Sequence, residues 1–297
     1  MATVDNKIDQ LEDLRDRSST FKQFMRFLRK QPLGSAGLLV VFVMILVAIF
    51  APYLSTLDPE ANSFETMLIG PGADHFLGTD EFGRDVLTRI MYGARTALFV
   101  GLTSAFIGST IGLVLGVASA YFGGRFDLIF QRIMDIFMAF PIIILALAIV
   151  SILGTATHNV IAAITLPFIP RCARVVRSSA LAIREIPYID AARANGFSNT
   201  RIIMRHMVPN VMAPYLIMLT AAVGQAILLE ASLSFLGLGV QEPTPAWGLM
   251  LRNAQDYIES APWVAIWPGF AITLAVFGFN MFGDAIRDSL DPRLRSQ

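Results

Sequence analysis

Six long apolar stretches constrain the fold of this chain more than any other feature of its sequence. With 55% hydrophobic and only 15% charged residues, the chain lies outside the range of typical soluble proteins. A transmembrane helix needs about 20 mostly apolar residues to cross the hydrocarbon core of a bilayer. Backbone polar groups in lipid must also be hydrogen-bonded within the segment, which favours helices. The sequence therefore predicts an all-α, polytopic membrane protein with six transmembrane helices, at residues 33–54, 95–120, 128–153, 158–178, 210–238 and 263–284.

The distribution of Lys and Arg predicts the orientation of these helices. Nineteen of the 23 basic residues fall in the four segments that six spans place on one side of the membrane. Only Arg84, Arg89, Arg95 and Arg252 fall on the opposite side. Since cytoplasmic loops carry the excess of Lys and Arg, both termini are expected in the cytoplasm. About thirty polar residues precede the first span, so we expect that span to stay in the mature protein.

This topology divides the chain into four parts. Residues 1–32 and 288–297 are predicted to be cytoplasmic terminal segments. Residues 33–94 hold the first transmembrane helix and an acidic extracytoplasmic loop, and residues 95–287 hold the transmembrane core. Within that core, the cytoplasmic segment 179–209 carries many of the arginines.

Small residues and prolines inside the spans indicate how the helices pack. Gly108, Gly112 and Gly116 recur every four residues and form a stripe that lets another helix approach closely. The alternative is that these glycines only reflect how common glycine is in membrane helices. Pro141 and Pro214 are expected to kink their helices unless they lie in a first turn.

Glu230 is the acid that this topology places deep in a span. An ionisable side chain there faces protein or water rather than lipid, which makes Glu230 a candidate for the translocation path. The alternative is a structural role, either because the helix boundary is shifted or because Glu230 is hydrogen-bonded to a neighbouring helix.

The segment after the fourth span predicts two short helices joined by a glycine. Pro187 suits the first turn of a helix, and Asp190 would lie in its N-terminal half, where the helix dipole favours negative charge. Gly196 suits a left-handed C-cap, and Ser198 suits the N-cap of a second helix. Pro209 is expected to end that second helix.

Small side chains give the first of these helices a nearly flat surface. Ala191 and Ala192 allow close docking into a groove on a partner. The alternative is an ordinary loop whose arginines lie on anionic lipid headgroups. The residues alone do not separate these two interpretations.

The spacing in this segment resembles the EAA loop of ATP-binding-cassette (ABC) importer permeases. That pattern is Glu-Ala-Ala, three residues, Gly, nine residues, and Ile-x-Leu-Pro. Here Asp190 stands at the glutamate position, while His206 and Val208 depart from the apolar Ile and Leu. The resemblance implies that the segment 179–209 contacts an ATPase subunit. The coupling-loop residues it implies are Asp190, Ala191, Ala192, Asn195, Gly196 and Pro209.

Three further strings are similar to the inner-membrane permeases of peptide and nickel importers, and more narrowly to the C-type subunit of dipeptide and oligopeptide systems. They are HFLGTDEFGRDVLTRIMYGARTAL (75–98), LLEASLSFLGLGVQEPTPAWGLML (228–251) and NMFGDAIRDSLDPRLR (280–295). The resemblance covers about residues 20 to 295. It implies the permease core of a type I ABC importer in the bacterial inner membrane, moving short peptides by alternating access. Nickel complexes, glutathione or another small solute are the alternative cargoes.

The same resemblance implies a set of partners. A second homologous permease would complete a heterodimer, and two cytoplasmic ATPase subunits would bind the ATP and Mg. An extracytoplasmic solute-binding protein would deliver the cargo. The chain also contacts membrane lipid, and no nucleic acid partner is expected.

The loop before the second span predicts a short surface helix. Thr79 can cap a helix in which Phe82, Val86 and Ile90 form an apolar stripe at the outer membrane surface. Asp80, Arg84 and Asp85 are then candidates for docking the binding protein. The alternative is an ion pair within the chain.

Motifs for chemistry are missing from the sequence. A phosphate loop of the form G-x-x-x-x-G-K-[ST] is excluded, because Lys30 is the last lysine. His75, His158 and His206 are too scattered to suggest a metal site, and Cys172 is interpreted as a buried apolar side chain. We therefore expect no catalytic, cofactor-binding or metal-binding residue and no enzyme activity in this chain. The competing classes are an ion-coupled secondary transporter that uses Glu230 and, more remotely, an intramembrane enzyme or a scaffold.

Overall fold

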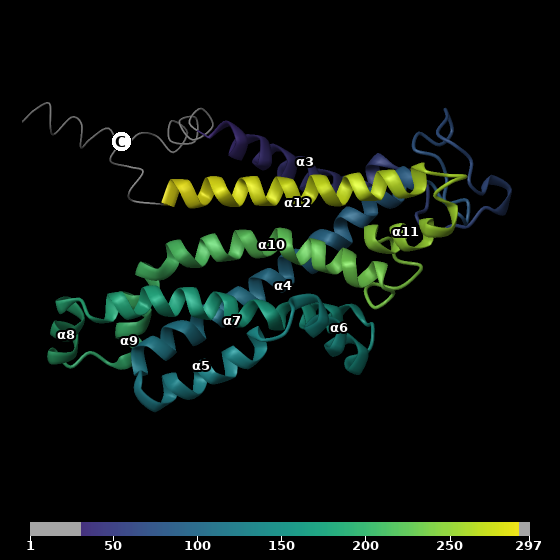
Figure 1. Cartoon of the computed structure of the whole chain (residues 1–297). Helices are drawn as coiled ribbons and strands as arrows, with labels where there is room; N and C mark the ends of the chain where they lie inside the picture. Colours follow the sequence, from purple (N-terminus) through teal and green to yellow (C-terminus); the bar gives the residue numbers. More distant parts are fainter. Residues whose placement is uncertain (1–30, 291–297) are drawn as a thin grey trace, which may run out of the picture.

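The computed structural model of the protein describes residues 31–290, which fold into a bundle of helices. Five helical stretches in this range are long and apolar enough to cross a membrane. Figure 1 shows them lying roughly along one common direction. They are α3 (Pro32–Leu54), α4 (Val86–Phe122), α7 (Thr157–Arg184), the run Asn199–Phe235 that ends in α10 (Met212–Phe235), and α12 (Trp263–Leu290).

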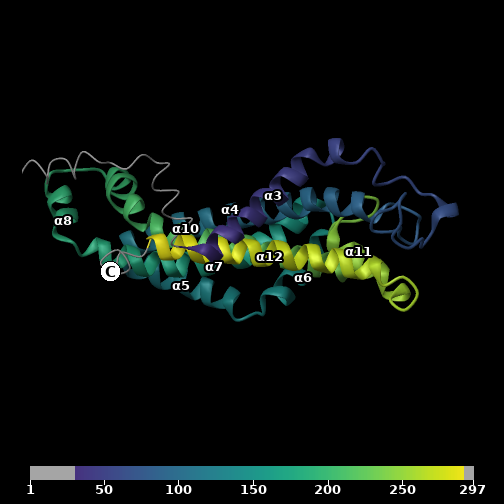
Figure 2. The ribbon, with the colours of Figure 1, turned by 90° about the horizontal axis from the view of Figure 1, so that it is seen from above.

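Short elements gather at the two ends of this bundle. The α8 end carries α8 (Pro187–Ala194) and α9 (Asn199–Ile202), together with the start of α3 and the end of α12 (Figure 1). The α11 end carries the loop 55–85 and α11 (Trp247–Asn253), with the 3₁₀ turns η1 (Phe64–Thr66) and η4 (Ala254–Tyr257). Turned by 90°, the molecule is elongated, and α8 lies at its tip (Figure 2).

The third apolar window is broken into two helices. α5 (Gly124–Met138) and α6 (Ile142–Leu153) meet at an angle of 90°. Pro141 lies between them, at the N-cap of α6, where it has no N–H to donate and disfavours helical geometry in the preceding residue. The predicted kink at Pro141 is confirmed. The prediction of six spans holds when this bent pair counts as one span.

Pro214 meets the exception stated for it. It lies in the first turn of α10, where the N–H that proline lacks is not needed. The second span also starts earlier than predicted, at Val86. The Asp85 side chain caps this start by accepting the N–H of Thr88 at 2.8 Å.

The glycine stripe of α4 packs against α7. A Cβ atom added at Gly112 would lie 2.7 Å from Cβ of Cys172 and 2.8 Å from the carbonyl oxygen of Ile169. A Cβ atom added at Gly116 would lie 2.6 Å from the carbonyl oxygen of Ala173. These distances are too short for any side chain, so the predicted close approach of another helix is confirmed.

The buried apolar side chains form two main clusters. The larger one fills the α11 end and the middle of the bundle, around Leu98, Phe168 and Ile227. The second lies toward the α8 end, and includes Val117 of α4 and Ile189 of α8. Because α8 contributes to the same cluster as α4, it belongs to the packed bundle and is not a loosely attached loop.

Candidate functional site

α8 is a short helix anchored to the rest of the bundle. Pro187 occupies its first turn, as predicted. Ile189 is fully buried and Ala192 is 6% exposed, and both pack in the cluster that contains Val117 and Tyr121 of α4. The apolar side of α8 therefore rests on the end of α4.

A left-handed turn closes α8. Gly196 has a φ of 73°, a conformation that residues with a side chain rarely adopt. The N–H of Gly196 donates to the carbonyl of Arg193 at 2.9 Å, and the N–H of Phe197 donates to the carbonyl of Ala192 at 3.1 Å. This pair of bonds is the Schellman motif, and it confirms Gly196 as the residue that ends the helix.

The chain then turns straight into α9. Ser198 caps α9 by accepting the N–H of Arg201 at 3.4 Å, which confirms its predicted role. Tyr121 of α4 donates from its hydroxyl to Oδ1 of Asn199 at 2.7 Å. Both ends of the turn around Gly196 are thus tied to the bundle.

His206 packs between aromatic rings where the EAA pattern carries an apolar residue. Its ring stacks on Phe197, with centroids 6.2 Å apart and an interplanar angle of 14°, and lies 5.8 Å from the ring of Tyr188. The departure from the family pattern therefore keeps a packing role inside the loop.

The outer surface of α8 is open to a partner. Asp190, Ala191, Arg193 and Asn195 are exposed, whereas Ala192 is turned inward. Asp190 and Arg193 form an ion pair at 3.0 Å, which contributes little at such exposure. The structure thus separates the two alanines of the loop. Ala191 faces outward, and Ala192 supports the helix from below.

Pro209 does not end the second short helix, so that prediction is wrong. After α9 the chain continues without a break through a π-helical turn, Ile203–Met207, and a 3₁₀ turn, Val208–Val211, into α10. Proline removes one backbone hydrogen bond, and a wider turn followed by a tighter one absorbs the loss. Next to Pro209, the Asn210 side chain donates to the carbonyl of His206 at 2.6 Å.

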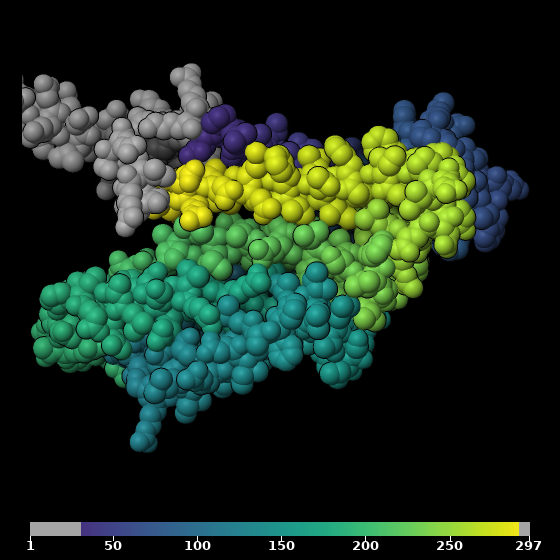
Figure 3. Space-filling model, in the orientation of Figure 1, coloured from purple at the N-terminus to yellow at the C-terminus, as the bar shows by residue number. Residues whose placement is uncertain are grey.

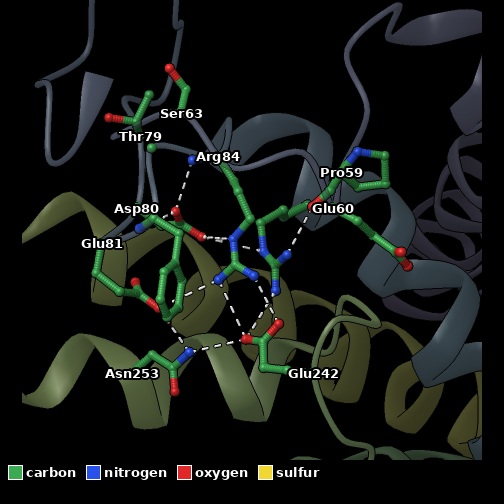
Figure 4. A network of polar contacts seen from close by, with 12 residues as sticks. Pro59, Glu60, Ser63, Thr79, Asp80, Glu81, Arg84, Glu242 and Asn253 are labelled. Atoms are coloured by element: carbon green, nitrogen blue, oxygen red, sulfur yellow. Dashed lines mark hydrogen bonds and ion pairs between the residues drawn. The ribbon is translucent and has the colours of Figure 1, made fainter. Parts of the chain in front are cut away.

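A second polar site lies at the α11 end, where charged side chains from three parts of the chain meet (Figure 4). Arg84 contacts Asp80 through Nε at 2.7 Å and Glu242 through Nη1 at 2.8 Å. Arg89 is fully buried, donates to the carbonyl of Pro59 at 2.8 Å, and lies 3.5 Å from both Asp80 and Glu242. The outer network joins the loop 55–85, the start of α4, the segment before α11 and the end of α11, and it consists of Asp80, Glu81, Arg84, Arg89, Glu242 and Asn253.

The predicted helix starting at Thr79 is absent, and this prediction is wrong. Residues 79–85 form a tight turn closed by an isolated antiparallel bridge between Thr79 and Asp85. The Asp80 carboxylate accepts the N–H groups of Phe82 and Arg84, each at 2.9 Å, and so stabilises the turn. Gly83, at a φ of 72°, interrupts the apolar stripe that suggested a helix.

The predicted docking residues therefore lie inside the protein. Asp80, Arg84 and Asp85 are 3%, 4% and 7% exposed, and Asp85 pairs with His75 at 3.0 Å. These side chains form ion pairs within the chain, which was the alternative to docking. Contact of these side chains with a binding protein stays a prediction. The sequence argument had no role for Glu242 or Asn253, since pairing across more than 150 residues leaves no local signal.

Burial and neighbouring charges shift the pKa values of two side chains in the outer network. Burial, followed by the negative charge of Asp80, raises the pKa of Glu81 above its ordinary value. Burial alone would lower the pKa of Arg84. The hydrogen bonds and charges of Glu242 and Asp80 outweigh it, and they raise the pKa of Arg84 above its ordinary value.

Glu230 points into the protein. It is 1% exposed and accepts a hydrogen bond from Ser234 at 2.7 Å, and Ser234 in turn accepts the N–H of Val240 at 3.2 Å. This chain of bonds fastens the end of α10 to the segment that follows it. The hydrogen bond of Glu230 is made within α10 and not to a neighbouring helix, as the structural alternative had it, and a role of Glu230 in the translocation path stays a prediction.

Comparison with known sequences shows the protein family to which this chain belongs. The family described as "Binding-protein-dependent transport system inner membrane component" matches residues 108–296, more than half of the chain. The chain belongs to this family. The N-terminal transmembrane domain of oligopeptide transport permease C also matches, at residues 19–71. The first of these matches includes the coupling-loop segment 179–209 and the end of the predicted core at residue 287.

Curated relatives extend over nearly the whole chain. The dipeptide transport system permease protein DppC of Alkalihalophilus pseudofirmus is 44% identical, over 96% of this chain and 94% of its own. A putative peptide transport system permease protein of Brucella abortus is 45% identical over 88% of each chain. The glutathione transport system permease protein GsiD of Escherichia coli is 40% identical, over 92% of this chain and 90% of its own.

A solved structure supports the fold. The inward-facing MetNI methionine ABC transporter matches with a TM-score of 0.56 at 21% identity, and the match covers 69% of this chain and 97% of the MetNI chain. The all-α permease core of a type I importer, predicted from the sequence, is confirmed. This permease is a multi-pass membrane component of a transport system. Within residues 31–290, no group of three or more His, Cys, Asp or Glu side chains is placed to hold a metal ion.

Proposed function

We propose that this permease carries short peptides across the bacterial inner membrane as a subunit of an ABC importer. Its near full-length similarity to permeases named for dipeptide and peptide transport supports this substrate class. Glutathione, nickel complexes or another small solute are the alternative cargoes, and the similarity to GsiD supports the first of these.

The assembly we propose has four kinds of subunit. This chain pairs with a second, homologous permease as a heterodimer. Two cytoplasmic ATPases bind ATP and Mg and dock on the α8 end, and an extracytoplasmic binding protein meets the α11 end. The arginines at the end of α7 and in α8 and α9, which are Arg184, Arg193 and Arg201, support a cytoplasmic α8 end with both termini on the same side.

The single observation that supports the coupling role is the way α8 is held. Its outer surface, with Asp190, Ala191 and Asn195, is exposed, while Ile189 and Ala192 lock its inner side to α4. A short helix held at both ends transmits a displacement to the spans. Closure of the ATPases would therefore move α8 and rock the bundle between inward-open and outward-open states. The difference in contact free energy between those states sets the coupling.

Reconstitution tests this proposal. Proteoliposomes that contain this chain, the second permease and both ATPases should take up radiolabelled dialanine. Uptake should require the binding protein outside and ATP with Mg inside. Omission of any one component should abolish it. Uptake by this chain alone, driven by a proton gradient, would overturn the proposal in favour of a secondary transporter.

Crosslinking tests the docking of α8. A cysteine at Ala191, which is exposed, should crosslink to an ATPase subunit in membranes, and ATP should change the yield. A cysteine at Ala73, exposed in the loop 55–85 at the opposite end, is the matched control and should capture no ATPase. Equal capture at both positions would contradict the proposed orientation.

A further inference from the structure

Three arginines follow one another along α7, and they differ in how their charge is neutralised. Arg174 pairs with Asp135 of α5 at 2.5 Å. Arg177 pairs with Asp127 of α5, also at 2.5 Å. Arg171 has neither partner. Within residues 31–290, no carboxylate oxygen lies within 4.0 Å of its guanidinium.

Arg171 instead meets an amide on the neighbouring span. Its Nη1 donates to Oε1 of Gln225 on α10 at 3.1 Å. An amide neutralises no charge, and it keeps two N–H donors of its own. Figure 3 shows the face on which the surfaces of α7 and α10 lie side by side, between α5 and α12. On this part of the surface Gln225 is exposed and Arg171 is half-buried.

This pair lies near the middle of two helices that are long and apolar enough to cross a membrane. Arg171 stands 14 residues after Thr157, the first residue of α7, or about 21 Å along the helix. Gln225 stands ten residues before Phe235, the last residue of α10, or about 15 Å. A helix that began at the membrane surface would reach the middle of the hydrocarbon core after about 15 Å, so we place both residues within the spans. An unpaired guanidinium at that depth is costly against lipid, so it faces water or another protein.

A small cavity opens beside the pair. It has a volume of about 70 Å³ and is lined in part by Ser109, Arg171, Ala221 and Gln225. This volume exceeds the roughly 10–15 Å³ that one bound water needs, so the space admits a small polar group such as a carboxylate. We call it the α7–α10 notch.

Ser109 supplies an independent sign that the notch takes a ligand. Its side chain is 1% exposed, and its hydroxyl has no hydrogen-bond partner among the described residues. Buried hydroxyls are normally paired, and an unpaired one signals a missing partner. The notch thus combines a cation without a counter-ion, an amide and an unpaired hydroxyl, all of which can donate hydrogen bonds.

We propose that the α7–α10 notch lies on the translocation path and binds a carboxylate of the transported solute through Arg171, Gln225 and Ser109. A guanidinium and neutral donors match a carboxylate in charge and geometry. The inference rests on the proposed function, because it treats the passing solute as a peptide with a free C-terminal carboxylate. Arg171, in place of Glu230, is then the charged residue of the path.

Cysteine reactivity in the assembled importer tests the electrostatic part. Ala221 lines the notch and is exposed, so Ala221→Cys in a Cys172→Ala background reports on the site and leaves Arg171 and Gln225 in place. In nanodiscs, an anionic methanethiosulfonate should react faster than a cationic one. Arg171→Gln should lower that rate ratio about ten-fold, because a nearby unit charge acts across a partly buried site. Arg174→Gln is the matched control and should change the ratio little, since Asp135 already neutralises Arg174.

Protection tests the ligand. Dialanine at millimolar concentration should slow the labelling of Ala221→Cys, and dialaninamide, which lacks the carboxylate, should not. Neither probe requires the binding protein here, because both faces of a nanodisc are open. Equal protection by both probes, protection by neither, or an unreactive cysteine would overturn the inference.

Uptake separates this inference from the proposed function. In proteoliposomes, Arg171→Gln should lower dialanine uptake about ten-fold, and Arg171→Lys should restore much of it, as a charge contact predicts. If the unsubstituted importer takes up no dialanine, the proposed function fails. If it does take up dialanine, but Arg171→Gln leaves the ratio of the two labelling rates unchanged, only the inference fails.

Discussion

The guanidinium of Arg84 lies 2.8 Å from the carboxylate of Glu242, although 158 positions separate the two residues. Arg89 reaches the same carboxylate at 3.5 Å. One side chain from the segment before α11 thus contacts an arginine in the loop 55–85 and an arginine in the first turn of α4. This arrangement fixes how the outer loops sit on the bundle.

Glu242→Ala should therefore destabilise the α11 end. It leaves Arg84 and Arg89 with fewer partners, and an underpaired buried charge costs about 1–3 kcal/mol. Thermal unfolding in detergent should show a midpoint lower by several degrees. Glu60→Ala is the control, because Glu60 is exposed and points away from the arginines in Figure 4. Equal midpoints for the two variants would count against the network.

Glu81 should make stability depend on pH. Burial and Asp80 raise its pKa in the folded protein, so the folded state favours the protonated form. Its stabilising contribution is fully present below the ordinary pKa of 4.5 and is lost as the pH rises through the raised value. Relative to Glu81→Gln, the unsubstituted protein should gain stability as the pH falls from neutral toward that range. A difference between their unfolding midpoints that does not vary with pH would contradict this assignment.

Gly196→Ala should weaken coupling. The left-handed conformation costs a residue with a side chain about 1–2 kcal/mol, although the space around Gly196 is open. The strain should shift or loosen α8 and lower the ATP hydrolysis that the binding protein stimulates. Gly196→Asn is the matched variant, because asparagine tolerates this conformation better. If importers that contain either variant hydrolyse ATP equally poorly, backbone strain at residue 196 is not the reason.

Gly112→Ala should destabilise the contact between α4 and α7. The added Cβ would lie 2.7 Å from Cβ of Cys172, so the helices must separate at a cost of about 1–3 kcal/mol. Gly269→Ala adds the same methyl group in α12, where the nearest atom is 3.9 Å away. That control should be neutral or slightly stabilising. Thermal unfolding in the same detergent should therefore show a lower midpoint for Gly112→Ala than for Gly269→Ala.

Glu230→Gln should keep most of the ATP-driven uptake. Glutamine can still accept the hydrogen bond from Ser234, so the end of α10 stays fastened. An ion-coupled carrier would instead lose transport altogether when this acid is neutralised. Uptake of dialanine by the reconstituted importer, compared with that of the unsubstituted chain, distinguishes the two.

Local patterns predicted the local structures well. Apolar length located the spans, since a helix must satisfy its own backbone in lipid. Pro187, Gly196 and Ser198 identified both ends of α8 and the start of α9, because capping depends on residues a few positions apart. The prediction of a helix after Thr79 was wrong, because Gly83 and the Asp80 side chain stabilise a turn there. The prediction that Pro209 ends the second short helix was wrong because the helical run continues past a proline that lacks an N–H.

By itself, then, the sequence determined the number of apolar crossings, the family and the place of the short helix at the α8 end, all of which follow from contiguous residues. Only the tertiary structure decided which polar groups meet. It paired Arg84 with Glu242 and placed Arg171 beside Gln225 without a counter-ion, while it enclosed Glu230. Charge contacts depend on distances between side chains that the fold brings together from remote positions, and one-dimensional spacing carries no information about those distances.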